Sequence, residues 1–444
     1  PKDVVLTISS SIQYKTEAAL EHAVKESSAK AGMAIVLDHR TGEILAMANY
    51  PTFDPNKLQG ITADNLSNRC IQGVYAPGSV FKVITYSSAF DKGLLTPDSM
   101  ISVGNGTLDV AGHKFTDSHT SGTVDATKAF AHSSNICAIK TGMRVGREGF
   151  YGMLQKYGFG EPTGVELPAE TGGIVRKLDR WNGDSLASMS IGYEIGVSAL
   201  QMASAFATIA NNGIRVKPHI IKEIRQSDQT KVFEPQPESV QSVSSTTAQN
   251  MKRLMRAVVT SGTGKRAQLV GYTSAGKTGT AWKFDEKTKR VSSAKYVSSF
   301  IGFAPVDNPA FTIAVVMDEP KVGGRNGGQV AAPVFKEIAE SVLAEMRVPF
   351  DLTADAQPVD TEDVQESVGN GDPQTSNDEH DANIDGAKTR SEVNRSAENQ
   401  KNDSDAASPE PKKKATNSER PRVIEKPKLV PEKPLPNIKD RLKT

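Results

Sequence analysis

Ser79 and Lys82 are separated by two residues in the segment 75–82, which reads YAPGSVFK. A serine hydroxyl is a poor nucleophile until a neighbouring base takes its proton, and a lysine serves as that base when burial or a nearby cation lowers its pKa. The Pro77-Gly78 turn precedes an apolar run with room for a helix, so we expect Ser79 at the helix N-terminus and Lys82 one turn further on the same face. A Ser-x-x-Lys pair alone is also common on solvated helix faces, so this spacing needs support from other motifs.

Two motifs further along the chain supply that support. Ser133-Ser134-Asn135 lies between AFAH and ICAIK, which indicates a loop–helix junction, and Lys277-Thr278-Gly279-Thr280 lies between two segments that resemble β-strands. Ser-x-x-Lys, Ser-x-Asn and Lys-Thr-Gly, in that order, form the three-motif signature of the penicillin-binding and serine β-lactamase fold. Each motif is weak alone, whereas the ordered triple is specific.

The sequence disfavours two other kinds of site. Residues 271–278 match the phosphate-binding pattern Gly-x4-Gly-Lys-Thr, but this pattern needs a helix after it, and the following segment GTAWKF is extended and contains glycine. A Ser-His-Asp triad is the other option, yet the sequence has neither a Gly-x-Ser-x-Gly elbow nor a His-Glu-x-x-His segment. His132 directly precedes Ser133, and adjacent side chains point apart in a helix or a strand, so we interpret His132 as structural or solvent-exposed.

The composition excludes several classes of protein. The 444 residues include 53 basic and 52 acidic ones, which gives a net charge of +1. The chain therefore lacks the overall positive charge that would indicate nucleic-acid binding. The two cysteines, Cys70 and Cys137, form no Cys-x-x-Cys pair and indicate neither a disulfide framework nor a zinc site; two buried thiols are the simpler interpretation. No run approaches the ~18 apolar residues of a membrane span, and there is no signal peptide. Because the chain starts at Pro1 in a strand-like segment, we expect the natural N-terminus, with any membrane anchor, to lie outside it.

The order of expected elements indicates an α+β fold. Strands are expected at 4–8 and, as a hairpin around Arg40-Thr41-Gly42, at 33–38 and 43–48; later strands are expected at about 269–275, 278–284, 296–304 and 310–317. Helices are expected at 11–29, near Asn65, at 79–92, after Ser133, and at 146–157, 199–210, 246–259 and 332–346, with irregular chain at 93–124. Strands at both ends of the chain predict one antiparallel sheet flanked by helices, with an all-helical subdomain that carries Ser79 and Ser133.

The last part of the chain differs from the rest. Residues 351–388 are rich in Asp and Glu, and residues 409–444 are rich in Lys and Pro. Neither stretch buries enough apolar surface to offset the cost of ordering, so we predict a domain at 1–349 and a disordered tail at 350–444. Attachment of the basic end to a membrane or partner, and a solubilising role, both stay open.

With its three motifs, the chain resembles the transpeptidase domain of class B penicillin-binding proteins over about residues 1–347. The flanking stretches of the likeness favour septal, elongation or sporulation enzymes over β-lactamases. Val80 departs from the threonine common after the serine, with no chemical role lost. These stretches are LD…TGEILAM from residue 37, YPTFDPN from residue 50, TGVELP from residue 163, and IGY…VSALQMA from residue 191.

The resemblance implies a role for each motif residue in the formation of an acyl-enzyme. Ser79 attacks the penultimate D-Ala carbonyl of a peptidoglycan stem peptide, with Lys82 as its base. Ser133, helped by Lys277, relays a proton to the leaving D-Ala amine, and Asn135 holds Lys82 and the substrate amide.

The resemblance also implies how the substrate is held. Lys277, Thr278 and Thr280 receive the terminal carboxylate, and the backbone amides of Ser79 and Thr280 form the oxyanion hole. Gly279 lets the substrate backbone lie against the strand, because a side chain there would block it.

The implied activity is that of a serine-type D-Ala-D-Ala transpeptidase that forms cross-links and is acylated by β-lactams. No metal or organic cofactor is called for. Implied partners are stem peptides, a glycosyltransferase and other membrane proteins of wall synthesis, at the outer face of the cytoplasmic membrane. Two alternatives stay open: a hydrolase of the D,D-carboxypeptidase or β-lactamase type, and a catalytically silent scaffold.

Overall fold

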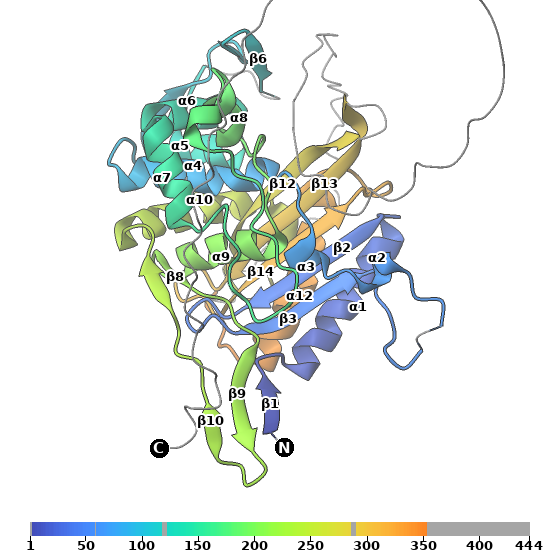
Figure 1. Cartoon of the computed structure of the whole chain (residues 1–444). Coiled ribbons are helices and arrows are strands. Elements are labelled where there is room, and N and C mark those ends of the chain that lie inside the picture. The colour runs from blue at the N-terminus through green and yellow to red at the C-terminus, as the bar shows by residue number, and fades with distance from the viewer. Residues whose placement is uncertain (1, 58, 118–121, 286–289, 353–444) are drawn as a thin grey trace, which may run out of the picture. The chain divides into compact units, whose positions relative to one another are not determined.

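The centre of the protein is a five-stranded antiparallel sheet. The computed structural model describes residues 2–57, 59–117, 122–285 and 290–352. Strands from both ends of this part lie side by side in the sheet, as the sequence predicts, and the Arg40-Thr41-Gly42 hairpin joins its last two strands. In sheet order the strands are β12 (Ala275–Asp285), β13 (Arg290–Ala304), β14 (Phe311–Asp318), β2 (Ala31–Leu37) and β3 (Ile44–Tyr50) (Figure 1).

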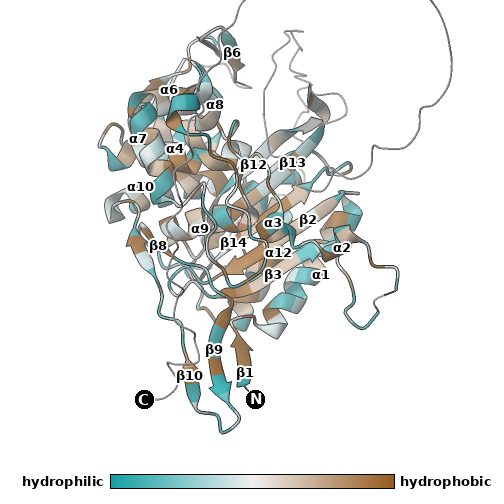
Figure 2. Ribbon diagram, viewed as in Figure 1, coloured by the Kyte–Doolittle hydropathy of each residue, from teal (hydrophilic) through white to brown (hydrophobic). Residues whose placement is uncertain are grey.

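The central strands are apolar because both faces of the sheet are covered. Every residue of β2 is buried, as are all but the last of β14, and Figure 2 shows apolar residues along β14 and β3. Side chains alternate between faces along a strand. Ala34 and Val36 accordingly pack in one hydrophobic cluster, and Met33 and Ile35 in another.

Two long helices cover one face of the sheet. α1 begins after Ser9, whose side chain accepts a hydrogen bond from the Ile12 amide, and it packs against β2 and β3. α12 packs against β13, β14 and α1. The elements on this side are α1 (Ser10–Glu26), η3 (Lys265–Ala267), α11 (Gly327–Val330) and α12 (Ala332–Glu345).

The other face is covered by the middle of the chain, which is mainly helical. α9 is buried along its whole length and packs on β2, β13 and β14. α10 packs against β12 on one side and against α4 and α5 on the other. The elements of this region are α2 (Ala63–Leu66), α3 (Arg69–Gln72), η1 (Gly78–Phe81), α4 (Lys82–Asp91), α5 (Ala126–Ala131), α6 (Asn135–Val145), α7 (Arg147–Lys156), η2 (Leu178–Arg180), α8 (Ser185–Ser190), α9 (Ala199–Ala210) and α10 (Ser245–Thr260).

Two expectations about strands are wrong. The first strand does not join the main sheet: β1 pairs with β9, which also pairs with β10, and together they project from the body of the molecule (Figure 1). The segment 269–275 is not a strand but a turn at Gly271, which has φ 77°, closed by an isolated bridge from Leu269 to Tyr272.

The segment 93–124, expected to be irregular, contributes to two small antiparallel pairs, β4 with β7 and β5 with β6. The strands outside the main sheet are β1 (Lys2–Leu6), β4 (Met100–Ser102), β5 (Thr107–Val110), β6 (His113–Thr116), β7 (Thr123–Asp125), β8 (Ile214–Val216), β9 (Ile221–Gln226), β10 (Lys231–Phe233) and β11 (Ser239–Gln241).

After α12 the chain remains attached to the domain for several residues. The Phe350 and Tyr272 ring centroids are 4.9 Å apart, and the Thr273 amide donates to Asp351 Oδ1 at 2.7 Å. The tail predicted from residue 350 lies outside the described residues except for its first three. None of the described helices is both long and apolar enough to cross a bilayer.

Candidate active site

The Ser79 turn is held against two other parts of the chain. Gly78 has φ 57° and donates its amide to Gly192 O at 3.1 Å, while a Cβ on Gly78 would lie 3.0 Å from Thr280 O. Ser79 is in the second position of η1 and is half-buried. Among the described residues its hydroxyl has no hydrogen-bond partner, so it is available to a ligand that reaches this edge of β12.

Lys82 is fully buried in the first turn of α4. Its Nζ donates to Ser133 O at 2.6 Å, to Asn135 Oδ1 at 2.7 Å and to Ser133 Oγ at 3.2 Å. Burial lowers the pKa of Lys82 to about 7, against the opposing effect of the Asp117 charge. A lysine with this pKa is substantially neutral near pH 7, which is what a general base requires.

Ser133 lies between the two lysines of the three motifs. It sits in the link between α5 and α6 with φ 61°, a left-handed conformation that few non-glycine residues adopt. Its Oγ is 3.2 Å from Lys82 Nζ and 2.9 Å from Lys277 Nζ. Both amines donate to this oxygen, and the hydroxyl can donate in turn to whichever amine is neutral.

Lys277 is also fully buried, on β12. Besides Ser133, its Nζ donates to Thr278 O at 3.1 Å and lies 5.6 Å from the centroid of the Phe130 ring. Burial lowers the pKa of Lys277 well below its ordinary value, and the nearby charge of Lys82 lowers it further. Two like charges that share one hydroxyl disfavour the doubly protonated state, so the two lysines titrate as a coupled pair.

The two threonines after Lys277 differ in their surroundings. The buried Thr278 hydroxyl lies 2.6 Å from Thr263 Oγ1. The Thr280 hydroxyl is half-buried and accepts a hydrogen bond from the Gly327 amide at 3.3 Å. Of the two hydroxyls, that of Thr280 is the one partly open to an incoming ligand.

The reason expected for Gly279 is wrong. A Cβ there would lie 2.5 Å from Ser299 Oγ and 2.9 Å from Val80 Cγ1, so a side chain would meet the protein interior rather than a ligand lying on the strand. The glycine is needed because the nucleophile turn and β13 approach β12 closely at this point.

Tyr193 marks the free edge of β12; in the sequence it belongs only to the IGY stretch of the likeness, with no role of its own. Its hydroxyl accepts a hydrogen bond from the Trp282 amide at 3.4 Å, on the side of β12 away from β13. Amides of an antiparallel strand alternate in direction, so the Thr280 amide, two residues earlier, faces the same free edge. It therefore points toward the Ser79 turn, as an oxyanion-hole donor would.

Asp117 was also missed, because an aspartate in a short irregular segment carries no periodic signal. Its carboxylate accepts hydrogen bonds at the N-terminus of α6, from the Asn135 amide and from the Ser134 hydroxyl. It thereby links the end of β6 to the Ser-x-Asn motif.

The nucleotide-site alternative is excluded by the local fold. Gly276 to Thr278 run within β12 rather than into a helix, so no helix N-terminus is present to cradle phosphate. The Lys277 ammonium is directed to Ser133. Among the described residues, no three His, Cys, Asp or Glu side chains are grouped to hold a metal ion.

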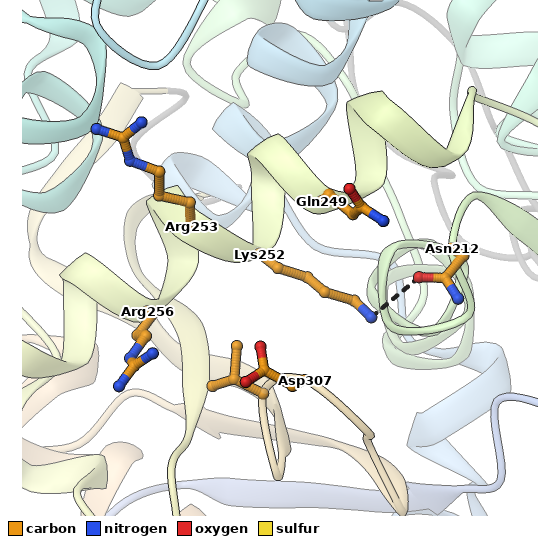
Figure 3. A pocket seen from close by; sticks show the side chains of 7 residues that line it. Asn212, Gln249, Lys252, Arg253, Arg256 and Asp307 are labelled. Carbon is orange, nitrogen blue, oxygen red and sulfur yellow. Dashed lines mark hydrogen bonds between the residues drawn. The ribbon is translucent and has the colours of Figure 1, made fainter.

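A separate polar hollow of about 470 Å³ lies between α10, the C-terminal end of α9 and the chain after β13 (Figure 3). Lys252 extends across it and donates to Asn212 Oδ1 at 3.1 Å, whereas Arg253 points away and pairs with Asp98. The hollow is lined by no residue of the three motifs and by no serine or cysteine, so the chemistry of the three motifs does not belong to it. Its lining is Asn212, Gln249, Lys252, Arg253, Arg256, Val306 and Asp307.

Comparisons with known proteins agree on one family. A family model described as the penicillin binding protein transpeptidase domain matches residues 32–340. The chain is 37% identical over 358 residues to penicillin-binding protein PbpB of Mycolicibacterium smegmatis, which covers 78% of this chain and 55% of PbpB. It is 31% identical over 350 residues to the peptidoglycan D,D-transpeptidase FtsI of Buchnera aphidicola, with 79% of this chain and 59% of FtsI covered. The chain thus spans about half the length of the curated relatives it matches.

Solved structures show the same likeness. The aztreonam complex of penicillin-binding protein 3 from Mycobacterium tuberculosis superposes with a TM-score of 0.75 at 36% identity, covering 81% of this chain and 82% of that one. The transpeptidase domain of penicillin-binding protein 3 from Burkholderia pseudomallei gives a TM-score of 0.69 at 35% identity, covering 78% of this chain and 98% of that one.

Proposed function

The chain belongs to the penicillin-binding protein transpeptidase family, as a class B transpeptidase domain, and from this premise we propose that it is a serine-type D-Ala-D-Ala transpeptidase that cross-links peptidoglycan. One observation carries the proposal: the Ser133 hydroxyl lies between the buried amines of Lys82 and Lys277. Lys82 itself follows Ser79 by one helical turn. This arrangement provides a nucleophile, a base and a proton relay at the edge of one strand.

In the proposed first step, neutral Lys82 takes the hydroxyl proton of Ser79 as the oxygen attacks the penultimate D-Ala carbonyl. The Ser79 and Thr280 amides stabilise the oxyanion of the tetrahedral intermediate, a contribution of roughly 10²–10³ in rate per donor. Lys82 Nζ donates to Ser133 O and Asn135 Oδ1, so the proposed step requires Nζ to turn its lone pair toward Ser79 when substrate binds.

The intermediate then breaks down as the peptide C–N bond cleaves. The proton held by Lys82 passes through the Ser133 hydroxyl to the leaving D-Ala nitrogen, and Lys277 stabilises Ser133 while it changes partners. The products are free D-Ala and an ester between Ser79 and the donor peptide.

The same residues would hold the substrate before reaction. Its terminal carboxylate is received by Lys277 and the Thr280 hydroxyl, and Thr278 contributes through its contact with Lys277 Nζ at 3.4 Å. Asn135 holds the substrate amide, and Gly279 keeps β12 close enough to the Ser79 turn for both oxyanion donors to act together.

In the second step an amine of a neighbouring stem peptide attacks the ester, and Ser79 regains its proton as the cross-link forms. Water in place of the amine would give hydrolysis. A β-lactam mimics D-Ala-D-Ala and would leave a slowly released adduct on Ser79.

We place this reaction at the outer face of the cytoplasmic membrane, because cross-linked peptidoglycan lies there. An N-terminal membrane anchor, a glycosyltransferase and other membrane proteins of wall synthesis complete the proposed assembly. Within this chain, the proposed organisation is a transpeptidase domain at 1–349 followed by a tail at 350–444.

The proposal is tested by intact-mass spectrometry after brief treatment with benzylpenicillin, with peptide mapping of the adduct. We expect one adduct on Ser79 that persists and is absent in Ser79→Ala. An adduct lost within seconds would support a hydrolase instead. A folded wild-type protein that forms no adduct would refute the catalytic proposal and support a silent scaffold.

A further inference from the structure

Asp117 follows directly after β6 and caps the helix that carries the Ser-x-Asn motif. Its Oδ1 accepts from the Asn135 amide and, at 3.2 Å, from the Ile136 amide, and its Oδ2 accepts from Ser134 Oγ at 2.5 Å. The first amides of a helix have no partner within the helix, and a carboxylate there is favoured by the helix dipole. Hydrogen bonds to a charged acceptor are also the stronger kind.

The same segment sets the orientation of the Asn135 side chain. Asn135 Nδ2 donates to Thr116 O at 3.2 Å, so Oδ1 is the atom left to accept from Lys82 Nζ at 2.7 Å. An amide turned the other way would place an NH₂ group against the lysine amine. The backbone and the side chain of Asn135 are thus held by two successive residues, Thr116 and Asp117.

Asp117 also supplies negative charge beside Lys82. The charged or titratable groups that act with Lys82 come from three elements: Asp117 after β6, Cys137 on α6 and Lys277 on β12. Cys137 has a raised pKa, chiefly because of burial, so its thiol is neutral at neutral pH. The Asp117 charge raises the pKa of Lys82 and so opposes the effect of burial.

We propose that Asp117 is a positioning residue for acyl transfer, which fixes Asn135 and Ser133 relative to Lys82 and contributes the anion that balances the buried lysine. This inference rests on the proposed transpeptidase function. Asp117 itself touches Ser134 and the start of α6 rather than the reacting atoms.

The test measures the rate of benzylpenicillin acylation from pH 5 to pH 9 for wild type, Asp117→Asn and Asp125→Asn. Asp125 is a matched control, because its carboxylate caps the neighbouring helix α5 through the Lys128 amide at 2.7 Å and contacts no motif residue. We expect Asp117→Asn to acylate about 10- to 100-fold more slowly on the alkaline plateau, since small misplacements of reacting groups have effects of this size.

Loss of the Asp117 charge should also shift the pH dependence of acylation. Removal of the anion lowers the pKa of Lys82, so the midpoint of the acid limb should move to lower pH in Asp117→Asn and stay in place in Asp125→Asn. Ser134→Ala removes one of the Asp117 contacts but keeps the charge, so it should slow acylation without moving the midpoint.

The outcomes distinguish this inference from the function on which it rests. If wild type forms no adduct, the proposed function is wrong. If wild type reacts and Asp117→Asn has the same plateau and midpoint, the inference alone is overturned. If Asp117→Asn does not fold, Ser134→Ala decides: reaction at the wild-type rate overturns the positioning role.

Discussion

The pH dependence of Ser79 acylation follows directly from the burial of Lys82. As the proposed base, Lys82 acts only when neutral, and the neutral fraction increases as pH rises through its pKa of about 7. The acylation rate should therefore rise with pH on an acid limb and level off above pH 8. Because Lys82 and Lys277 share Ser133, the observed midpoint belongs to the pair.

The size of this pH effect on the acylation rate depends on how far the pKa of Lys82 lies below its ordinary value of 10.5. With a pKa of about 7, roughly 1% of Lys82 is neutral at pH 5, about half at pH 7 and about 99% at pH 9. The rate should thus change about 100-fold over this range. An unperturbed lysine would be neutral in only about 0.03% of molecules at pH 7, so burial increases the reactive fraction by about 10³-fold.

The assay quenches the reaction of benzylpenicillin with the protein at a series of times and quantifies the adduct by intact mass. Constant ionic strength and circular dichroism at each pH separate titration of the site from loss of the fold. The Ser79→Ala variant provides the background of non-specific acylation.

Two results would refute this reasoning. A rate that increases tenfold per pH unit through pH 9 without a plateau would mean that Lys82 keeps an ordinary pKa. A rate that is constant from pH 5 to pH 9 would mean that no buried amine limits acylation.

Two further predictions concern the packing around the site. Gly192 has φ 84°, and the Cβ of Gly192→Ala would overlap the backbone of Gly78, so we expect a lower melting temperature and slower acylation. Gly112→Ala is the control, because Gly112 has the same φ but open space around its Cβ. This variant should lose only about 1–2 kcal/mol in unfolding free energy and keep its acylation rate. Equal losses in the two variants would contradict the close packing of the nucleophile turn. Cys70 on α3 and Cys137 on α6 are buried free thiols, and burial raises the pKa of Cys70 to about 12. A thiol reagent should therefore label neither residue in the native protein and both after denaturation. Rapid labelling of the native protein would show that α3 or α6 opens.

Much of the fold was predictable because its signals are local. The hairpin of β2 and β3 follows from two apolar runs around a Thr-Gly turn, and the helices α7, α9, α10 and α12 follow from their periodicity and their end signals. The strand expected at 269–275 failed because its apolar residues flank Gly271, whose φ of 77° turns the chain. β1 joins β9 rather than the main sheet, and pairing between residues so far apart in sequence leaves no local trace.

The candidates for the chemistry can be identified from the sequence alone, because nucleophile, relay and carboxylate-binding motifs occur in a specific order. Only the tertiary structure brought them together: Ser133 contacts Lys82 from 51 positions away and Lys277 from 144 positions away. It also placed Asp117 at the N-terminus of α6 and showed that Gly279 faces the protein interior. The reason is physical, since the pKa of a lysine depends on the solvent that the whole fold excludes and on the charges that it brings near.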